Sequence, residues 1–365
     1  MAGDDKTPAG VRQTVNGRLL DQAIRRQVYL LRFGSGAVKD TLRFLDERLF
    51  DELIAILSAR LSRIEQRGVD LGPVTTDRIR QMVQETAALL RVRMNDAGRR
   101  VRQVAGDLAG IEAEAAVKAM QRLSPTGLDL QFRTLQLSQL QTILDTGING
   151  TPLDSWFDKL GQDTVARIEQ QIGIGIATGE TNEQVIRRIR GTRAGGYMDG
   201  VLGGTRRQAQ TVVRTTMNHV STQTRQRTYA ANPDLVKGVQ WVSTLDTRTS
   251  DVCKARDGKV YPLDKGPRPP AHPNCRSTVT PVLKSWRELG FKAKDVPAAT
   301  RASMDGQVPA SVSYGDWLND QTPDRQDEAL GRRRAELFRA GKISVEDLVR
   351  QDGKPLTLEQ LRDLE

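Results

Sequence analysis

The stretch from residue 240 to residue 281 constrains the fold of this chain more than any other part of it. It holds both cysteines, Cys253 and Cys275, and one of the two histidines, His272. It is also dense in turn-forming residues, among them Asp257-Gly258 and several prolines. Such residues fix the backbone into particular turns, whereas the sequence on either side has the pattern of long, charged helices. We therefore expect a compact, turn-rich module inside an otherwise helical chain.

Long amphipathic helices are predicted in the first third of the chain. From Arg18 to about Arg67, leucine and isoleucine recur at steps of three and four residues, with charged residues between them. The glycines of Gly34-Ser35-Gly36 predict a break in this stretch. A further helix is predicted from Pro73 to Arg122, and the turn Pro125-Thr126-Gly127 follows it. Helices of this kind pair as hairpins and take most of their stability from packing.

The middle of the chain is predicted to hold more helices and then a small sheet. Thr181 and Gln184 have the spacing of a capping box at a helix start, and one long helix is predicted from Thr205 to Ala231. The hydrophobic period changes after this helix, which favours strands. Three strands are predicted: around Trp241, at Lys259-Val260-Tyr261, and from Val279 to Val282.

The end of the chain is predicted to be a linker followed by a short helical tail. Proline and glycine residues after Lys292 indicate the linker. One helix is predicted from Asp324 to Arg339. Two capping pairs are predicted beyond it, Ser344 with Asp347 and Thr357 with Gln360. We interpret this end of the chain as a small docking element.

The composition favours helical structure with a large surface and a polyanionic partner. Of the 365 residues, 38% are hydrophobic, 4% aromatic and 27% charged. The formal net charge of +10 points to nucleic acid, although arginines interspersed with acidic residues are also typical of a plain solvated surface. One basic cluster is predicted to contact nucleic acid and consists of Arg187, Arg188, Arg190 and Arg193.

Neither a membrane span nor a secretory signal is predicted. No stretch approaches the roughly 18 consecutive apolar residues that a transmembrane helix needs. The first ten residues are polar and acidic, unlike a signal peptide. The two cysteines then favour reduced thiols in a cytosol over a disulfide framework.

Cys253, His272 and Cys275 are the residues whose chemistry suggests a site. Two thiolates and an imidazole are good zinc ligands, and Asp246 is the candidate for a fourth. We therefore predict a structural zinc bound by Cys253, His272, Cys275 and Asp246, and no other cofactor. Two other interpretations remain open from the residues alone. The cysteines can form a pair that packs, or a disulfide outside the cell, and Cys253 with His272 can form the nucleophile of a hydrolase or transferase.

The order and spacing of these residues resemble the Mu F-like phage head morphogenesis domain, found in minor head proteins of tailed bacteriophages. The shared elements are Arg214-Thr215, Trp241, Asp246-x-Arg248-Thr249, Cys253, Asp257-Gly258 and Pro270-x-His272-Pro273-x-Cys275-Arg276. The resemblance extends over about residues 150–285, and the segment from Tyr314 to Leu318 is similar to the tails of such proteins. Two positions depart from the family pattern: Thr216 stands where Glu is frequent, and Ser277 stands where many members have a further cysteine.

The resemblance implies a non-enzymatic minor head protein, made in the host bacterial cytoplasm and located in the virion, in the head interior or at the portal vertex. Such proteins associate with the portal protein, with the major capsid or scaffold protein and with packaged double-stranded DNA. They assist head assembly and can be ejected with the genome. The alternative is a Mu F-like enzyme or toxin-related protein that uses Cys253 and His272 as a nucleophile or metal site.

The predicted fold is mainly α: elongated helical hairpins with an embedded small α+β module and a short helical C-terminal tail. Four regions are predicted along the chain. They are a flexible arm over residues 1–16, a helical docking region over 17–137, the Mu F-like domain over 138–290, and the linker with the helical tail over 291–365.

Overall fold

The structure is a computed structural model that describes residues 15–65, 73–122, 131–148, 150–285, 287–289 and 300–350, together with residues 356 and 360. Some predicted features lie outside these residues: nearly all of the arm, the turn at 125–127, the linker up to residue 299 and the start of the Thr357 capping pair. By its internal contacts the chain divides into two compact units. The sheet unit contains residues 1–31, 109–139 and 218–365, and the helical unit contains residues 32–108 and 140–217. The four regions predicted along the sequence stay a prediction.

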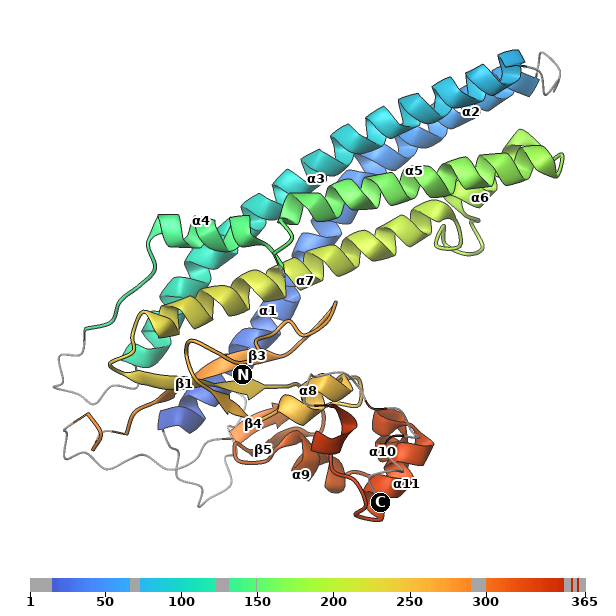
Figure 1. Cartoon of the computed structure of the whole chain (residues 1–365). Helices are drawn as coiled ribbons and strands as arrows, with labels where there is room; N and C mark the ends of the chain where they lie inside the picture. Colours follow the sequence, from blue (N-terminus) through green and yellow to red (C-terminus); the bar gives the residue numbers. More distant parts are fainter. Residues whose placement is uncertain are drawn as a thin grey trace, which may run out of the picture. The chain divides into compact units, whose positions relative to one another are not determined.

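The helical unit is built from long helices. It contains α1 (Val15–Leu45) from residue 32 onward, the π-helix η1 (Asp46–Phe50), α2 (Asp51–Glu65), α3 (Pro73–Gln121) as far as residue 108, most of α4 (Leu137–Thr146), α5 (Leu153–Ala177), α6 (Asn182–Arg190) and α7 (Val201–Ala230) as far as residue 217. Helices α2 and α3 form a hairpin of the predicted kind (Figure 1). Ion pairs of Arg60 with Glu85 and of Arg93 with Glu52 join its two antiparallel arms.

Leucines at every fourth position explain why this part of the chain is helical. Four of them are fully buried on one face: Leu45, Leu49, Leu53 and Leu57. The predicted break at Gly34-Ser35-Gly36 is wrong, since α1 runs through it without interruption. A glycine inside a helix costs only about 1 kcal/mol relative to alanine. Burial of Val38 and Leu45 in the same helix outweighs that cost.

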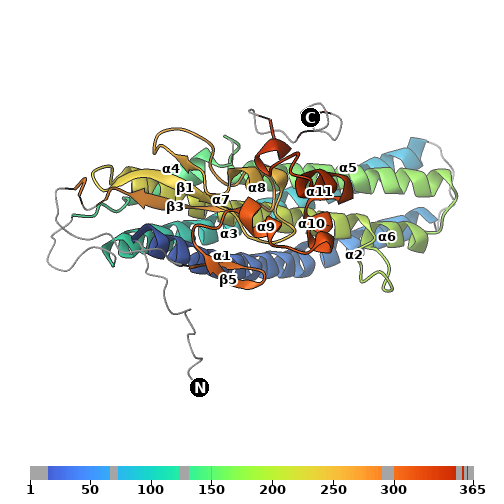
Figure 2. The ribbon, with the colours of Figure 1, turned by 90° about the horizontal axis from the view of Figure 1, so that it is seen from below.

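Helix α6 and the loop after it are fixed by local hydrogen bonds. The predicted capping box is confirmed, because the Thr181 side chain accepts from the Gln184 N–H and the Gln184 side chain accepts from the Thr181 N–H. Helix α6 packs against α2 and α5 (Figure 2). In the following loop, the Asp199 carboxylate accepts from the N–H and the hydroxyl of Thr192, at 2.7 and 2.6 Å. Helix α7 then starts at Val201, slightly earlier than predicted.

The sheet unit holds a three-stranded antiparallel sheet in the order β2-β1-β3. Strand β1 (Val236–Val242) lies between β2 (Val260–Tyr261) and β3 (Thr278–Leu283), so all three predicted strands are confirmed. In the register, Trp241 of β1 lies opposite Val279 of β3. A short helix that was not predicted, α8 (Asp251–Arg256), follows β1.

The ends of three helices pack on this sheet and provide its core. Apolar side chains of the sheet form one buried cluster with residues from these helices: Val236, Val239 and Val279 with Leu19 of α1, Met120 of α3 and Tyr229 of α7. Val236 and Val239 are three residues apart in β1, and the register shift between Val236 and Gly238 explains how both join the cluster that the helices cover.

The C-terminal part of the sheet unit has more structure than predicted. A hairpin of β4 (Thr300–Ser303) and β5 (Gly306–Pro309) forms within the predicted linker. It is followed by α9 (Tyr314–Asn319), α10 (Pro323–Leu330), α11 (Arg332–Arg339) and the 3-10 helix η2 (Glu346–Leu348). The predicted single helix from Asp324 to Arg339 is thus two helices. Gly331 separates them, because its φ of 79° lies in the left-handed region and ends α10.

The mainly α fold with an embedded α+β module is confirmed. Among the helices that the structure describes, none combines the length and the apolar character that crossing a membrane requires.

Candidate metal centre

Cys253 is presented by the short helix α8. Ser250 caps this helix, and its hydroxyl accepts a hydrogen bond from the Cys253 N–H at 3.4 Å. The Cys253 side chain shares a buried cluster with Cys275 and with Trp241, which is fully buried in β1. The Ser243 hydroxyl, at the end of β1, donates to the Cys253 carbonyl at 2.7 Å. The sheet and the helix cap together fix the position of the thiol.

His272 and Cys275 lie on the loop between β2 and β3. A tight turn brings them together: the Cys275 N–H donates to the His272 carbonyl at 3.2 Å, and Asn274 takes a left-handed conformation with φ of 58°. Asparagine tolerates this conformation better than most residues. Helix α7 anchors the turn, since the side-chain amide of Asn218 donates to the Cys275 carbonyl at 2.7 Å.

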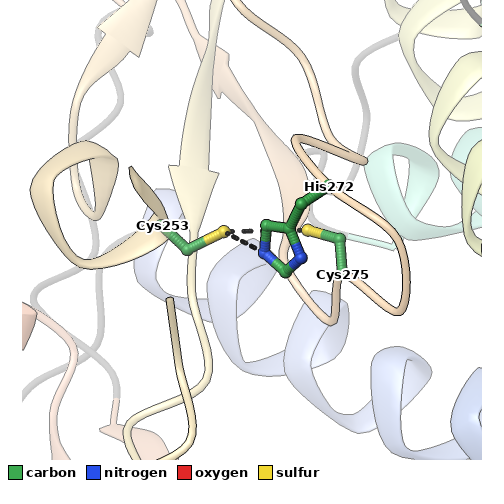
Figure 3. A group of neighbouring side chains, drawn as sticks. All are labelled: Cys253, His272 and Cys275. Atoms are coloured by element: carbon green, nitrogen blue, oxygen red, sulfur yellow. Dashed lines mark hydrogen bonds between the residues drawn. The ribbon is translucent and has the colours of Figure 1, made fainter. Parts of the chain in front are cut away.

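The three side chains converge with the spacing of zinc ligands (Figure 3). Their candidate ligand atoms all lie within 4.8 Å of one another. The two sulfurs are 3.7 Å apart, and the Cys253 Sγ lies 3.4 Å from the His272 Nε2. Zinc bonds of about 2.3 Å to sulfur and about 2.1 Å to nitrogen, at tetrahedral angles, would place two sulfurs about 3.8 Å apart and sulfur and nitrogen about 3.6 Å apart. The donor set and these two separations therefore fit zinc.

His272 turns its Nε2 towards the thiols. The Nδ1 lies 2.9 Å from the Pro273 carbonyl and donates to it, so the neutral ring carries no hydrogen on Nε2. The Ser250 hydroxyl lies 2.8 Å from Nε2 and donates to it. Histidines that bind metals usually have one nitrogen fixed by a carbonyl or carboxylate in this way.

The two thiols form a hydrogen bond, with their sulfurs 3.7 Å apart. The hydrogen bond with Cys253, together with the contact to His272, lowers the pKa of Cys275 to about 4. The same hydrogen bond, together with burial, raises the pKa of Cys253. Contact with Cys275 also raises the pKa of His272 above its usual value, although burial opposes this. Metal binding requires thiolates, so it would release the protons that the two thiols still hold.

Asp246, the predicted fourth ligand, does not join these three residues. The Arg276 guanidinium binds its carboxylate through two hydrogen bonds of 2.5 and 2.8 Å. The Arg248 N–H and the Thr249 hydroxyl each donate a further bond at 3.1 Å. Burial opposes ionisation, but the Arg276 contacts outweigh it and lower the pKa of Asp246. A bidentate arginine pair satisfies this carboxylate, so the structure brings together three of the four predicted ligands.

Both cysteines are free and nearly inaccessible. Their sulfur separation of 3.7 Å is far longer than a disulfide bond. The exposed fraction is 2% for Cys253 and 4% for Cys275. A nucleophile has to reach its substrate, so this burial favours metal ligands over the nucleophile of a hydrolase or transferase.

The surroundings of the centre include two serines. Ser250, which the sequence analysis missed, hydrogen-bonds to His272. Serine is common at helix caps, and nothing in its spacing marked this one as part of a site. Ser277, which stands at the position where similar domains often have a cysteine, is 2% exposed, and its hydroxyl lies 3.2 Å from the Ser243 hydroxyl.

The four arginines predicted to contact nucleic acid lie in the helical unit, on α6 and the loop after it. Arg188 is bound by the carboxylate of Glu180. The other three arginines line a groove beside α2: Arg187, Arg190 and Arg193. The structure therefore separates Arg188 from the other members of the predicted cluster.

Comparison with known families identifies the segment that carries the metal centre. Residues 166–280 match the family described as Phage Mu protein F like protein. The match begins in α5, ends in β3 and includes Cys253, His272 and Cys275. Searches of curated proteins and of solved structures each found no match. The resemblance read from the sequence is thereby confirmed: residues 166–280 of the chain are similar to the Phage Mu protein F like family.

Proposed function

We propose that the protein is a non-enzymatic minor head protein of a tailed bacteriophage, which acts at the portal vertex or inside the head. The family match over residues 166–280 carries this proposal. Its partners are the portal protein, the major capsid or scaffold protein and the packaged double-stranded DNA. The protein assists head assembly and is ejected with the genome.

Two features of the chain support contact with these partners. The net charge of +10 suits the phosphates of packaged DNA, which basic proteins bind without regard to sequence and in a salt-dependent way. Apolar side chains are exposed within about one turn of the long helix α1, at Val28, Tyr29 and Leu31. Exposed apolar residues on a long helix suit docking on another protein.

Quantitative mass spectrometry of purified virions tests the head role. Virions are measured intact and after triggered release of their DNA. We expect a few copies per intact particle and their loss with the DNA. If the protein stays in the emptied head, it is not ejected with the genome. If it is absent from virions altogether, the proposed role as a head protein is overturned.

We further propose that Cys253, His272 and Cys275 bind a structural zinc ion, with water or another donor in the fourth position. The match between the measured separations and tetrahedral zinc geometry supports this set. A bound zinc would supply a cross-link between α8 and the loop that carries His272 and Cys275. The chain itself holds the three donors in place through the Ser250 cap and the Asn218 anchor.

Metal content of the purified chain tests the zinc proposal. We expect about one zinc per chain, and its loss in Cys253→Ser and Cys275→Ser. Asp246→Asn is the control, since Asp246 is held by Arg276 and should not be needed for zinc. Cobalt substitution gives an independent readout, because cobalt bound by thiolates absorbs through sulfur-to-metal charge transfer. Loss of zinc in Asp246→Asn would show a different ligand set, and a wild-type chain that takes up no zinc would overturn the proposal.

A further inference from the structure

We propose that the groove between α2 and α6 in the helical unit is a binding site for the phosphate backbone of double-stranded DNA, with Arg187, Arg190 and Arg193 as the contacts. This inference deepens the proposed function, because it assigns the DNA contact to three residues. It also removes Arg188 from the set that the sequence suggested.

The groove is lined by basic and hydroxyl side chains. It has a volume of about 420 Å³ and lies where α6 packs against α2. Helix α2 contributes the hydroxyls of Ser58 and Ser62. Arginine and serine side chains, together with backbone N–H groups, are the usual donors to phosphate oxygens.

The three arginines are available to a ligand. Arg187 and Arg190 are three residues apart on α6, so they lie on the same face of the helix. All three arginine side chains are exposed. Among the described residues no salt bridge engages Arg187, Arg190 or Arg193, whereas Arg188 is paired with Glu180. The groove therefore offers three guanidinium groups that are not neutralised by carboxylates of the described chain.

The backbone around the groove is held in place before any ligand binds. Arg190 stacks on the ring of Tyr197, with its guanidinium carbon 4.8 Å from the ring centre. The Tyr197 N–H donates to the Thr192 carbonyl at 2.8 Å, and Asp199 binds the N–H and the hydroxyl of Thr192. These contacts fix the loop that carries Arg193. A fixed loop loses little conformational freedom on binding, which favours affinity.

The balance of charge in the groove favours phosphate. Glu183 is the acidic residue among its lining, against three arginines. An extended polyanion of regular charge spacing, such as duplex DNA, can engage the three guanidinium groups at once. Guanidinium groups that neutralise backbone phosphates release counterions, so the affinity must fall with salt.

Fluorescence anisotropy with a labelled random-sequence DNA duplex tests the site on the full-length chain. The variant Arg187→Ala/Arg190→Ala/Arg193→Ala should bind at least roughly tenfold more weakly at about 50 mM salt, and the slope of log K against log salt should become shallower by about 2 to 3. Arg188→Ala is the matched control, since it removes the same charge from the same helix but outside the groove. Its affinity should change less than about threefold. Helix content by circular dichroism shows whether each variant is folded.

A second variant keeps the test decisive if the triple variant does not fold. Glu183→Gln removes the groove's carboxylate and should tighten DNA binding roughly two- to threefold. Equal losses of DNA affinity in the triple variant and in Arg188→Ala would overturn the assignment. It would also be overturned if both variants bound DNA as tightly as the wild-type chain. Full competition by polyglutamate at matched charge would show that an acidic protein segment is the better occupant. Each of these outcomes leaves the virion measurement, and so the head role, unaffected.

Discussion

At the scale of single residues, Glu112 places a buried carboxylate inside the sheet unit. This residue of α3 is fully buried and binds two arginines, Arg26 of α1 at 2.6 Å and Arg225 of α7 at 2.7 Å. Arg225 also donates to the Thr278 hydroxyl of β3 at 2.7 Å. One carboxylate thus connects three helices and reaches the sheet through Arg225. A buried charge is stable only with such partners.

Removing this carboxylate should be costly. We expect Glu112→Ala to lower the free energy of unfolding by about 3–5 kcal/mol, because it leaves the buried guanidinium of Arg225 without a counter-ion. Asp40→Ala is the control, since Asp40 and Arg43 form an exposed pair that should contribute less than about 1 kcal/mol. Denaturant titration measures both values. Similar losses in the two variants would show that the Glu112 network contributes no more than a surface pair.

Ser277 allows the zinc proposal to be tested by adding a ligand. It is 2% exposed, and its hydroxyl hydrogen-bonds to that of Ser243, which also donates to the Cys253 carbonyl. We expect Ser277→Cys to supply a third thiolate and to raise the affinity for zinc at least roughly tenfold. Changing a residue that only hydrogen-bonds to a metal ligand already alters metal affinity by about that factor. Competition with a chelator measures the affinity, and the cobalt spectrum reports the added thiolate. Unchanged affinity and spectrum would show that this position does not face the metal.

At the scale of elements, the C-terminal segment supports the helix that carries Cys253. Lys254 of α8 donates to the Ala329 carbonyl at 2.5 Å, and Arg334 of α11 binds Asp251 of α8 at 2.7 Å. The Tyr314 hydroxyl donates to the Asp246 carbonyl at 2.7 Å. Arg301 of β4 forms a buried ion pair with Asp257, which follows α8, at 2.8 Å. The segment is therefore part of the sheet unit rather than an independent tail.

Trp317 provides a test of this support. It is 2% exposed and packs edge to face on Tyr314, with ring centres 5.2 Å apart. We expect Trp317→Ala to lower the free energy of unfolding by about 3–5 kcal/mol through the cavity that it leaves. Hydrogen exchange at α8 should become faster in the same variant. Trp317→Phe keeps most of the volume and should cost less than about 1.5 kcal/mol. Unchanged exchange at α8 in the alanine variant would contradict the link between the two segments.

Helices were predicted correctly from the sequence where the hydrophobic periodicity was strong. The prediction failed where a single glycine determined whether a helix continued or ended. The leucine pattern of α2 and the capping box of α6 were sufficient to locate those helices. At Gly34 the helix continues although glycine disfavours it, because burial outweighs a small local cost. At Gly331 the helix breaks, because the backbone turns there, and α10 and α11 pack against each other. Both positions are glycine in the sequence, which therefore does not show that the helix continues at Gly34 and ends at Gly331.

At the scale of the whole molecule, zinc should stabilise one compact unit and not the other. The candidate ligands all belong to the sheet unit. A ligand at 100 times its dissociation constant stabilises the folded state by about 2.7 kcal/mol. We therefore expect zinc to slow hydrogen exchange in β1, β3 and α8, and a chelator to reverse this. Exchange in α5, which lies in the helical unit, is the internal control. An equal response in α5, or none in the sheet unit, would contradict the prediction.

The sequence by itself determined the mainly α fold, the three strands, the family resemblance and the three residues of the candidate metal site. These follow from periodicity, turn chemistry and motif spacing, which are local properties of the chain. The tertiary structure decided which side chains meet. It paired Asp246 with Arg276 instead of the cysteines, and it left Arg188 outside the groove of the other arginines. Glu180 and Arg188 are 8 residues apart and Asp246 and Arg276 are 30 apart. At such separations several partners of suitable charge compete, and only the folded geometry selects one.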